Sequence, residues 1–310
     1  MNRPERLLKY TPSLKFLENS MFRFSQPEAL NDAYDALARQ SVNEYAPEDF
    51  EAAKAHALRS GVHGVSREKL ALFLSPFGHR TGEKSFPGLW PLHQPTLRSE
   101  PFHTLDEYDR AIAKRAVELA YDLANRMIGV FCLSESRHET MWATVYADDH
   151  RGVCVTFDPH HSFFAENRPG RMLYSDDPIQ ITINGGLVRF GGHTISKEGI
   201  LRGELECLPR EIFLRKETKW KFEEEWRIIK PLSNAEEIAG NDCEGRPVHL
   251  FSVPTQAIAG ITFGWRSNDA SIQSALQVID NDARWKHLWV RRRRRGPTGV
   301  TEEVVRDHKA

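Results

Sequence analysis

Short apolar runs near the N-terminus predict two strands. Leu7–Tyr10 is expected to form the first, and Met21–Phe24, in which apolar and polar positions alternate, is expected to form the second. Between them, Thr11 can cap a helix whose first position is Pro12, where the missing backbone N–H costs nothing. This helix would end at about Asn19. The chain is therefore expected to begin with a strand, a helix and a second strand.

The clearest helical period follows a capping box formed by Thr104 and Glu107. Apolar residues then recur at helical spacing up to Arg126, at Tyr108, Ile112, Ala116, Leu119 and Leu123. Residues 46–103 contain two further helical patches, followed by a stretch rich in proline, glycine and histidine. We expect a helical insertion at about residues 46–126.

Segments rich in β-branched and aromatic residues predict a sheet. Residues 127–133, 152–157 and 226–230 are expected to form its centre, and residues 248–253 and 261–263 two further strands. A late helix is marked by Ile272, Ala275, Leu276 and Ile279, and a short strand near His287–Val290 follows it. The predicted fold class is α/β (α+β), a single domain over residues 1–290 with a central mixed or antiparallel sheet and flanking helices.

The composition is that of a folded protein. The chain has 310 residues, of which 40% are hydrophobic and 27% charged, and its formal net charge is −1. No global field therefore draws it to nucleic acid or to a membrane. The N-terminus lacks an apolar signal region, and no apolar run approaches the ~20 residues of a membrane span. The four cysteines form no CxxC pair and are expected to be buried thiols. We expect a cytoplasmic protein without membrane contact.

A run of five arginines stands near the C-terminus. Residues 291–310 show no apolar periodicity and are expected to be a disordered basic tail. Five adjacent guanidinium groups can neutralise phosphates without reading sequence, so this run is a candidate nucleic-acid-binding segment. The alternative is a solvated basic tail. The candidate residues are Arg291, Arg292, Arg293, Arg294 and Arg295.

Three carboxylates stand between large aromatic residues in the stretch from 220 to 227. On a strand, Glu223, Glu225 and Arg227 would point to one face, and Trp226 and Ile228 would be buried on the other. A carboxylate beside a cation in apolar surroundings suits an acid, a base or a group that orients a ribose. The alternative is a structural Glu–Arg pair.

The connection between the first two central strands carries further candidates, because loops on a rigid scaffold often hold functional side chains. Ser134 and Glu135 begin it, and Trp142 and Tyr146 lie within it. The two aromatic rings could stack on a base or a nicotinamide ring. Alternatively, they are core aromatics whose polar atoms are satisfied at the rim.

Metal-binding patterns are weak. Asn31, Asp32 and Asp35 could be ligands of Mg²⁺ or Ca²⁺, but a turn with an Asx cap explains them equally well. The histidines lack HExxH spacing and a cysteine partner. No Walker loop, GxSxG elbow or GxGxxG fingerprint is present. The sequence therefore predicts no metal.

The order of these motifs resembles domain-of-unknown-function family 2971, which is found in bacteria and often linked to mobile or defence loci. The resemblance spans about Leu7 to Gly264 and omits the helical insertion and the arginine run. It rests on Lys9-Tyr10, Phe24-Ser25 with Pro27, Asn31-Asp32 and Asp35, Phe131–Glu135, Met141-Trp142, Tyr146-Ala147, His150–Gly152, and Trp220 with Glu223 and Glu225–Arg227.

More distantly, the pattern resembles ADP-ribosyltransferases. This resemblance implies NAD as co-substrate, a first-strand polar residue at the ribose, an aromatic or serine at the nicotinamide, and a later glutamate that holds the ribose. The catalytic residues it implies are Glu225, Glu223 and Tyr146. The cofactor-binding residues it implies are Lys9, Tyr10, Ser134, Trp142 and Arg227.

The leading hypothesis is an ADP-ribosyltransferase-like enzyme that uses NAD to modify a nucleic acid or a protein, in bacterial defence or as a toxin. One alternative is a nuclease in which Asp32, Asp35, Glu223 and Glu225 gather around Mg²⁺. The other is a non-enzymatic defence module that binds nucleic acid or a partner protein through the arginine run.

Overall fold

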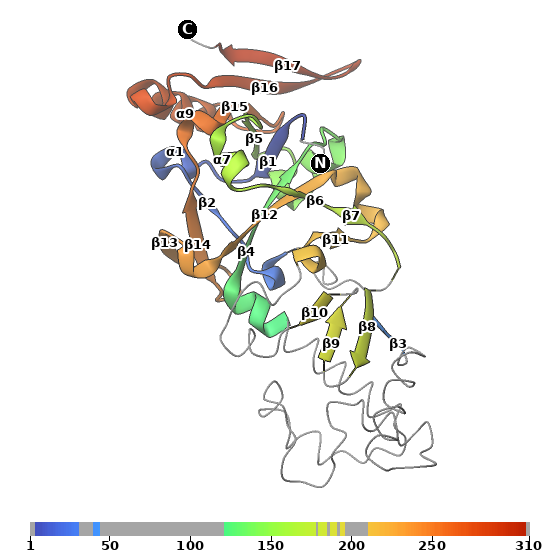
Figure 1. The fold of residues 1–310 in the computed structure, drawn as a ribbon. Coiled ribbons are helices and arrows are strands. Elements are labelled where there is room, and N and C mark those ends of the chain that lie inside the picture. The colour runs from blue at the N-terminus through green and yellow to red at the C-terminus, as the bar shows by residue number, and fades with distance from the viewer. Residues whose placement is uncertain are drawn as a thin grey trace, which may run out of the picture. The chain divides into compact units, whose positions relative to one another are not determined.

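The computed structural model describes residues 4–30, 40–43, 121–177, 179–184, 187–190, 193–195 and 210–307 (Figure 1). The chain divides into two compact units. The first, here the sheet unit, comprises residues 1–25, 129–174 and 218–310, and the second comprises residues 26–128 and 175–217. The sequence predicted instead one domain over residues 1–290, interrupted only at 46–126.

An eight-stranded mixed sheet dominates the sheet unit, as the sequence predicted for the fold class. Its strand order is β17-β16-β15-β5-β1-β4-β12-β6. Strands β15 and β16 pair in parallel, whereas β1 is antiparallel to both β4 and β5. The strands are β1 (Leu7–Thr11), β4 (Ile128–Ser134), β5 (Val153–Phe157), β6 (Gly170–Arg171), β12 (Glu225–Pro231), β15 (Ile258–Phe263), β16 (Trp289–Gly296) and β17 (Gly299–Arg306).

A smaller sheet and several short helices complete this unit. The smaller sheet has the order β13-β14-β2, with β13 (Glu237–Asn241), β14 (Pro247–Ser252) and β2 (Met21–Arg23). The strand β7 (Leu173–Tyr174) follows β6 along the chain. The α-helices are α1 (Phe16–Asn19), α6 (Glu139–Ala143), α7 (Ser162–Glu166) and α9 (Asp269–Asn281). The 3₁₀ helices are η2 (Val145–Ala147), η5 (Thr218–Glu223), η6 (Leu232–Asn234), η7 (Thr255–Ala257) and η8 (Ala283–Trp285).

The described part of the second unit contains a four-stranded sheet of order β10-β9-β8-β3. Its strands are β3 (Gln40–Asn43), β8 (Ile179–Asn184), β9 (Leu187–Phe190) and β10 (His193–Ile195). The short elements η1 (Pro27–Ala29), η4 (Arg210–Leu214) and β11 (Arg215–Lys216) also belong to it, and residues 121–127 are helical. The predicted capping box at Thr104 and Glu107 and the helical patches in 46–103 lie outside the described residues.

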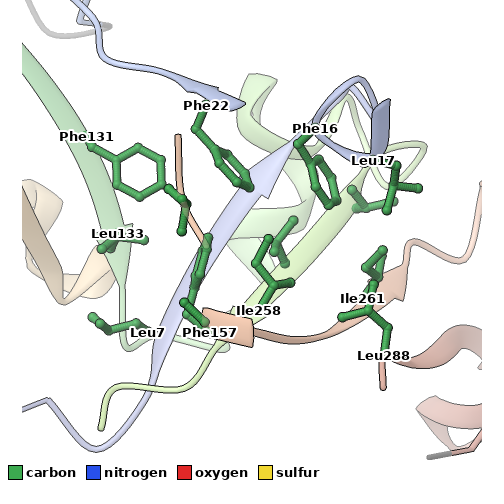
Figure 2. Packing of buried hydrophobic residues seen from close by; sticks show 14 of the residues in the cluster. Leu7, Phe16, Leu17, Phe22, Phe131, Leu133, Phe157, Ile258, Ile261 and Leu288 are labelled. Carbon is green, nitrogen blue, oxygen red and sulfur yellow. The ribbon is translucent and has the colours of Figure 1, made fainter. Parts of the chain in front are cut away.

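The main core lies on one face of the large sheet. Alternate side chains of the central strands point to it, among them Leu7, Phe131 and Phe157. The rings of Phe131 and Phe157 contact Phe22 of β2, which stacks on Phe16 of α1 (Figure 2). These rings pack at centroid separations of 5.1 to 6.0 Å. Because each aromatic side chain buries a large apolar area, these rings contribute much of the stability of the core.

The predicted helix from Pro12 to Asn19 is wrong in its first half. Thr11 pairs with Val153 as the last residue of β1, so its backbone belongs to the sheet and cannot cap a helix. The helix begins only at Phe16, where two apolar side chains reach the core. The late helix, by contrast, is confirmed as α9, which Asn268 caps by accepting a hydrogen bond from the Ser271 N–H at 2.7 Å.

The prediction of a disordered tail at 291–310 is wrong for the residues described there. Residues 289–306 form the antiparallel hairpin of β16 and β17, drawn in red in Figure 1. Val290 pairs with Ile261 of β15, which ties the hairpin to the main sheet. In the part of the chain that is described, every helix is too short or too polar to cross a bilayer.

Candidate functional site

Glu223 and Tyr146 form the polar centre of the candidate site. Glu223 is only 2% exposed, and its Oε1 accepts a hydrogen bond of 2.9 Å from the Tyr146 hydroxyl. Tyr146 itself is partly exposed and comes from η2, in the connection between β4 and β5. The two residues are 77 positions apart in sequence, and the pair was not predicted as such.

The prediction that Glu223 shares a strand face with Glu225 and Arg227 is wrong. Glu223 ends the 3₁₀ helix η5, and β12 begins at Glu225. Glu224 between them has a left-handed φ of 46°, which breaks the two-residue alternation of a strand. Trp226 and Ile228 do enter the main core, as predicted for that face.

Ser134 holds the backbone of Glu223 in place. Its hydroxyl donates a 2.5 Å hydrogen bond to the Glu223 carbonyl oxygen and accepts one of 2.9 Å from the Ser136 N–H. The Glu135 N–H bonds the next carbonyl, that of Glu224, at 3.1 Å. The end of β4 therefore fixes the turn that presents Glu223, and the buried Ser134 acts as a positioning residue.

Glu225 and Arg227 form a buried bidentate ion pair. The Arg227 Nε and Nη2 atoms donate to the two carboxylate oxygens of Glu225 at 2.7 and 3.1 Å, and Arg227 is 0% exposed. Both oxygens of Glu225 are thus used within the protein. This geometry favours the structural alternative for the pair over a role for Glu225 in catalysis.

Lys9 lies beside this pair. Its Nζ donates to the Cys132 carbonyl oxygen at 3.1 Å and sits 5.1 Å from the centre of the Phe131 ring. Burial lowers the pKa of Lys9, and the nearby negative charge of Glu225 opposes that shift. Lys9, which is partly buried, therefore belongs to the charge cluster of Glu225 and Arg227.

Tyr10 and Trp142 pack against each other in a second, smaller core cluster. The Tyr10 hydroxyl donates to the Ser136 carbonyl at 2.9 Å, and burial raises the pKa of Tyr10. The Trp142 ring contacts Tyr10 edge to face at 5.2 Å, and the Arg293 guanidinium lies 4.7 Å from its centre. Of the two alternatives for Trp142, the structure supports the core aromatic.

Two rings that the sequence did not single out lie near Glu223. Phe222 precedes it, and its ring is 5.8 Å from that of His138 and 6.0 Å from that of Trp220. His138 is exposed, and Phe222 is partly exposed. Phe222 and Tyr146 both pack against the smaller core cluster. The sequence did not predict the contact between Phe222 and His138, because the two rings come from segments far apart in the chain. The aromatic residues on either side of Glu223 were the signal that could have identified Phe222.

Most of the arginine run is paired with carboxylates. Arg292 pairs with Asp269, Arg293 with Glu139 at 2.5 Å, and Arg291 with Glu302 at 3.3 Å. Arg294 pairs with Glu303 at 2.7 Å, and the Arg295 guanidinium lies 5.3 Å from the centre of the Trp265 ring. The run is thus a charge-paired strand, which gives little support to phosphate binding along its whole length.

The predicted metal candidates Asn31, Asp32 and Asp35 lie outside the described residues. Within the residues that are described, no group of three or more His, Cys, Asp or Glu side chains gathers as metal ligands would. Glu223 and Glu225, which the nuclease hypothesis places at Mg²⁺, bond instead to Tyr146 and Arg227.

No protein-family model, no curated protein and no solved structure matches the chain. The resemblances to family 2971 and to ADP-ribosyltransferases therefore stay predictions that rest on the order of the motifs.

Proposed function

We propose that this protein is an NAD-dependent transferase that moves an ADP-ribosyl group to a macromolecular acceptor, with Glu223 as its central carboxylate. One observation carries the proposal: Glu223 is buried and oriented by the Tyr146 hydroxyl, at the place where the motif order expects a ribose-holding glutamate. Glu225 is not retained in this role, because Arg227 uses both of its oxygens.

The sheet brings the required segments together. Strands β1, β4 and β12 are consecutive in the strand order, and they carry the three blocks on which the resemblance depends. Ser134 at the end of β4 bonds the carbonyl of Glu223 just before β12, so two blocks are joined directly. Such preorganisation lets a carboxylate act without reorienting during the reaction.

When bound, NAD supplies a nicotinamide–ribose bond whose cleavage leaves positive charge on the ribose. Glu223 is suited to stabilise that charge, since a carboxylate in a water-poor site acts more strongly than one in bulk water. A ribose hydroxyl would donate to this carboxylate, sharing it with Tyr146. Phe222 and His138 offer partly exposed ring surface beside it, a role that the covered ring of Trp142 does not fit.

The test is release of nicotinamide from NAD by the purified protein in a bacterial lysate. Glu223→Gln keeps the size of the side chain and removes its charge, and we expect it to lower the rate by roughly 10²-fold or more. Glu224→Gln is the matched control, because Glu224 is the exposed neighbour and the charge change is the same. Equal rates for the two variants, or intact NAD with the wild type, would refute the proposal.

The acceptor is proposed to be a nucleic acid or a protein of the bacterial cytoplasm, which suits a defence or toxin role. The motif order supports this target, because it resembles a family linked to mobile and defence loci. With NAD labelled on its adenine, nuclease and protease digestion of the labelled lysate would identify the acceptor. Label that stays on small molecules alone would contradict a macromolecular target.

A further inference from the structure

A polar pocket opens on the face of the large sheet that lies away from the main core. Strand pairing brings Tyr10 of β1 next to Cys154 of β5, and Cys154 next to Thr262 of β15, on this one face. Thr156, two residues further along β5, also lines the pocket, which is open to solvent. Its lining comes entirely from the sheet unit.

Among the described residues, the charged side chains that line this pocket leave one cation, Arg137, without a counter-ion. Arg293 and Glu302 both line it, but Arg293 pairs with Glu139 and Glu302 pairs with Arg291. Arg137 also lines it, and among the described residues no carboxylate forms an ion pair with its guanidinium. The pocket therefore carries a net positive charge from an exposed side chain that is open to a ligand.

The remaining polar atoms add hydrogen-bond donors and no negative charge. The hydroxyls of Thr156 and Thr262 have no hydrogen-bond partner within the described part of the chain, although Thr262 is only 5% exposed. Burial raises the pKa of the Cys154 thiol to about 12, so this group stays neutral in the physiological range. Both threonines line the pocket, so their hydroxyls are placed to donate to a ligand that enters it.

We propose that this pocket binds a small oxyanion, either free phosphate or the phosphate group of a small phosphorylated molecule. The planar guanidinium of Arg137 can donate two parallel hydrogen bonds to such a group. Thr156 and Thr262 donate from the sheet beneath it. The inference does not depend on the proposed transferase activity, because it concerns a different set of side chains and is tested without NAD.

The experiment is calorimetric titration of the full chain with inorganic phosphate, and separately with ribose 5-phosphate. We expect saturable binding to the wild type, and a loss of roughly tenfold or more in affinity with Arg137→Gln, since a hydrogen bond to a charged group is removed. The control is Arg151→Gln, because Arg151 is 55% exposed, pairs with Asp149 and lies outside the pocket lining. It should bind as the wild type does.

Thr262→Val gives a second variant that removes only a hydroxyl. We expect it to weaken binding while its thermal midpoint without ligand stays at or above that of the wild type, because no bond within the protein is lost. Tighter binding of ribose 5-phosphate would identify a phosphorylated molecule, and tighter binding of phosphate the free anion. No saturable binding by the wild type, or equal affinity in Arg137→Gln and Arg151→Gln, would overturn the inference.

Discussion

Removing either member of the buried Glu225–Arg227 pair should strongly destabilise the sheet unit. Arg227 is fully buried and joined to Glu225 by two hydrogen bonds, so Arg227→Met removes two donors from the buried Glu225 carboxylate, and Glu225→Gln removes the negative charge that faces the Arg227 guanidinium. Each single substitution is expected to lower the free energy of unfolding by about 3–5 kcal/mol. The loss of stability in Arg227→Met is reduced by the nearby Lys9, because its positive charge still faces Glu225.

The double variant Glu225→Leu/Arg227→Met separates the pair from its surroundings. An apolar pair of similar volume carries no unpaired charge, so it should cost at least ~2 kcal/mol less than the sum of the two single changes. Urea unfolding followed by tryptophan fluorescence is the assay, since Trp226 and Trp285 are buried in this unit. Costs that simply add, or single variants within ~0.5 kcal/mol of the wild type, would refute the reasoning.

Three further predictions follow from single contacts. Gly264→Ala should cost about 1–3 kcal/mol or prevent folding, because a Cβ there would collide with the backbone carbonyl of His150; wild-type stability in urea would contradict this. Burial lowers the pKa of His150, so the unfolded chain binds its proton first and stability should fall as pH drops below the ordinary value of 6.5. His150→Asn should flatten that pH dependence, and an unchanged profile would count against it. Arg293→Ala should cost about 2 kcal/mol, because it loses both the contact with Trp142 and the ion pair with Glu139, whereas Arg294→Ala, at 52% exposure, should stay within ~0.5 kcal/mol; equal thermal shifts would show that these two contacts contribute little.

The central strands and the late helix were predictable because local pattern and burial agree there. Residues 127–133, 152–157 and 226–230 became β4, β5 and β12 with small changes at their ends. These segments are apolar enough to be buried wherever the chain places them. The N-terminal helix failed because pairing of Thr11 in the sheet outweighed its local capping preference.

The arginine hairpin was not predictable from local pattern. A run of five arginines has no apolar period. Its folding into a strand depends on partners far away in sequence, such as Glu139 for Arg293. Cross-strand pairing with Glu302 and Glu303 adds to this. Charge pairing across a sheet therefore replaced the hydrophobic alternation that identifies most strands.

The sequence predicted the carboxylates of the candidate site but not their roles, and it missed the rings of Phe222 and His138. The sequence predicted both Glu223 and Glu225 as candidates. Only the three-dimensional structure shows that Arg227 bonds the carboxylate of Glu225 and that Tyr146 orients the carboxylate of Glu223. The left-handed turn at Glu224 decides this, and a strand period cannot reveal it. Trp142 became a core residue because Arg293, from a segment expected to be disordered, covers its ring.

The central claim, transfer of an ADP-ribosyl group through Glu223, is tested most directly with doubly labelled NAD. One label is placed on nicotinamide and the other on adenine, and the wild type is compared with Glu223→Gln in the same lysate. We predict that the wild type releases free nicotinamide and attaches the adenine label to macromolecules in equal amounts, and that Glu223→Gln does neither. Both labels remaining together on intact NAD with the wild type would contradict the account.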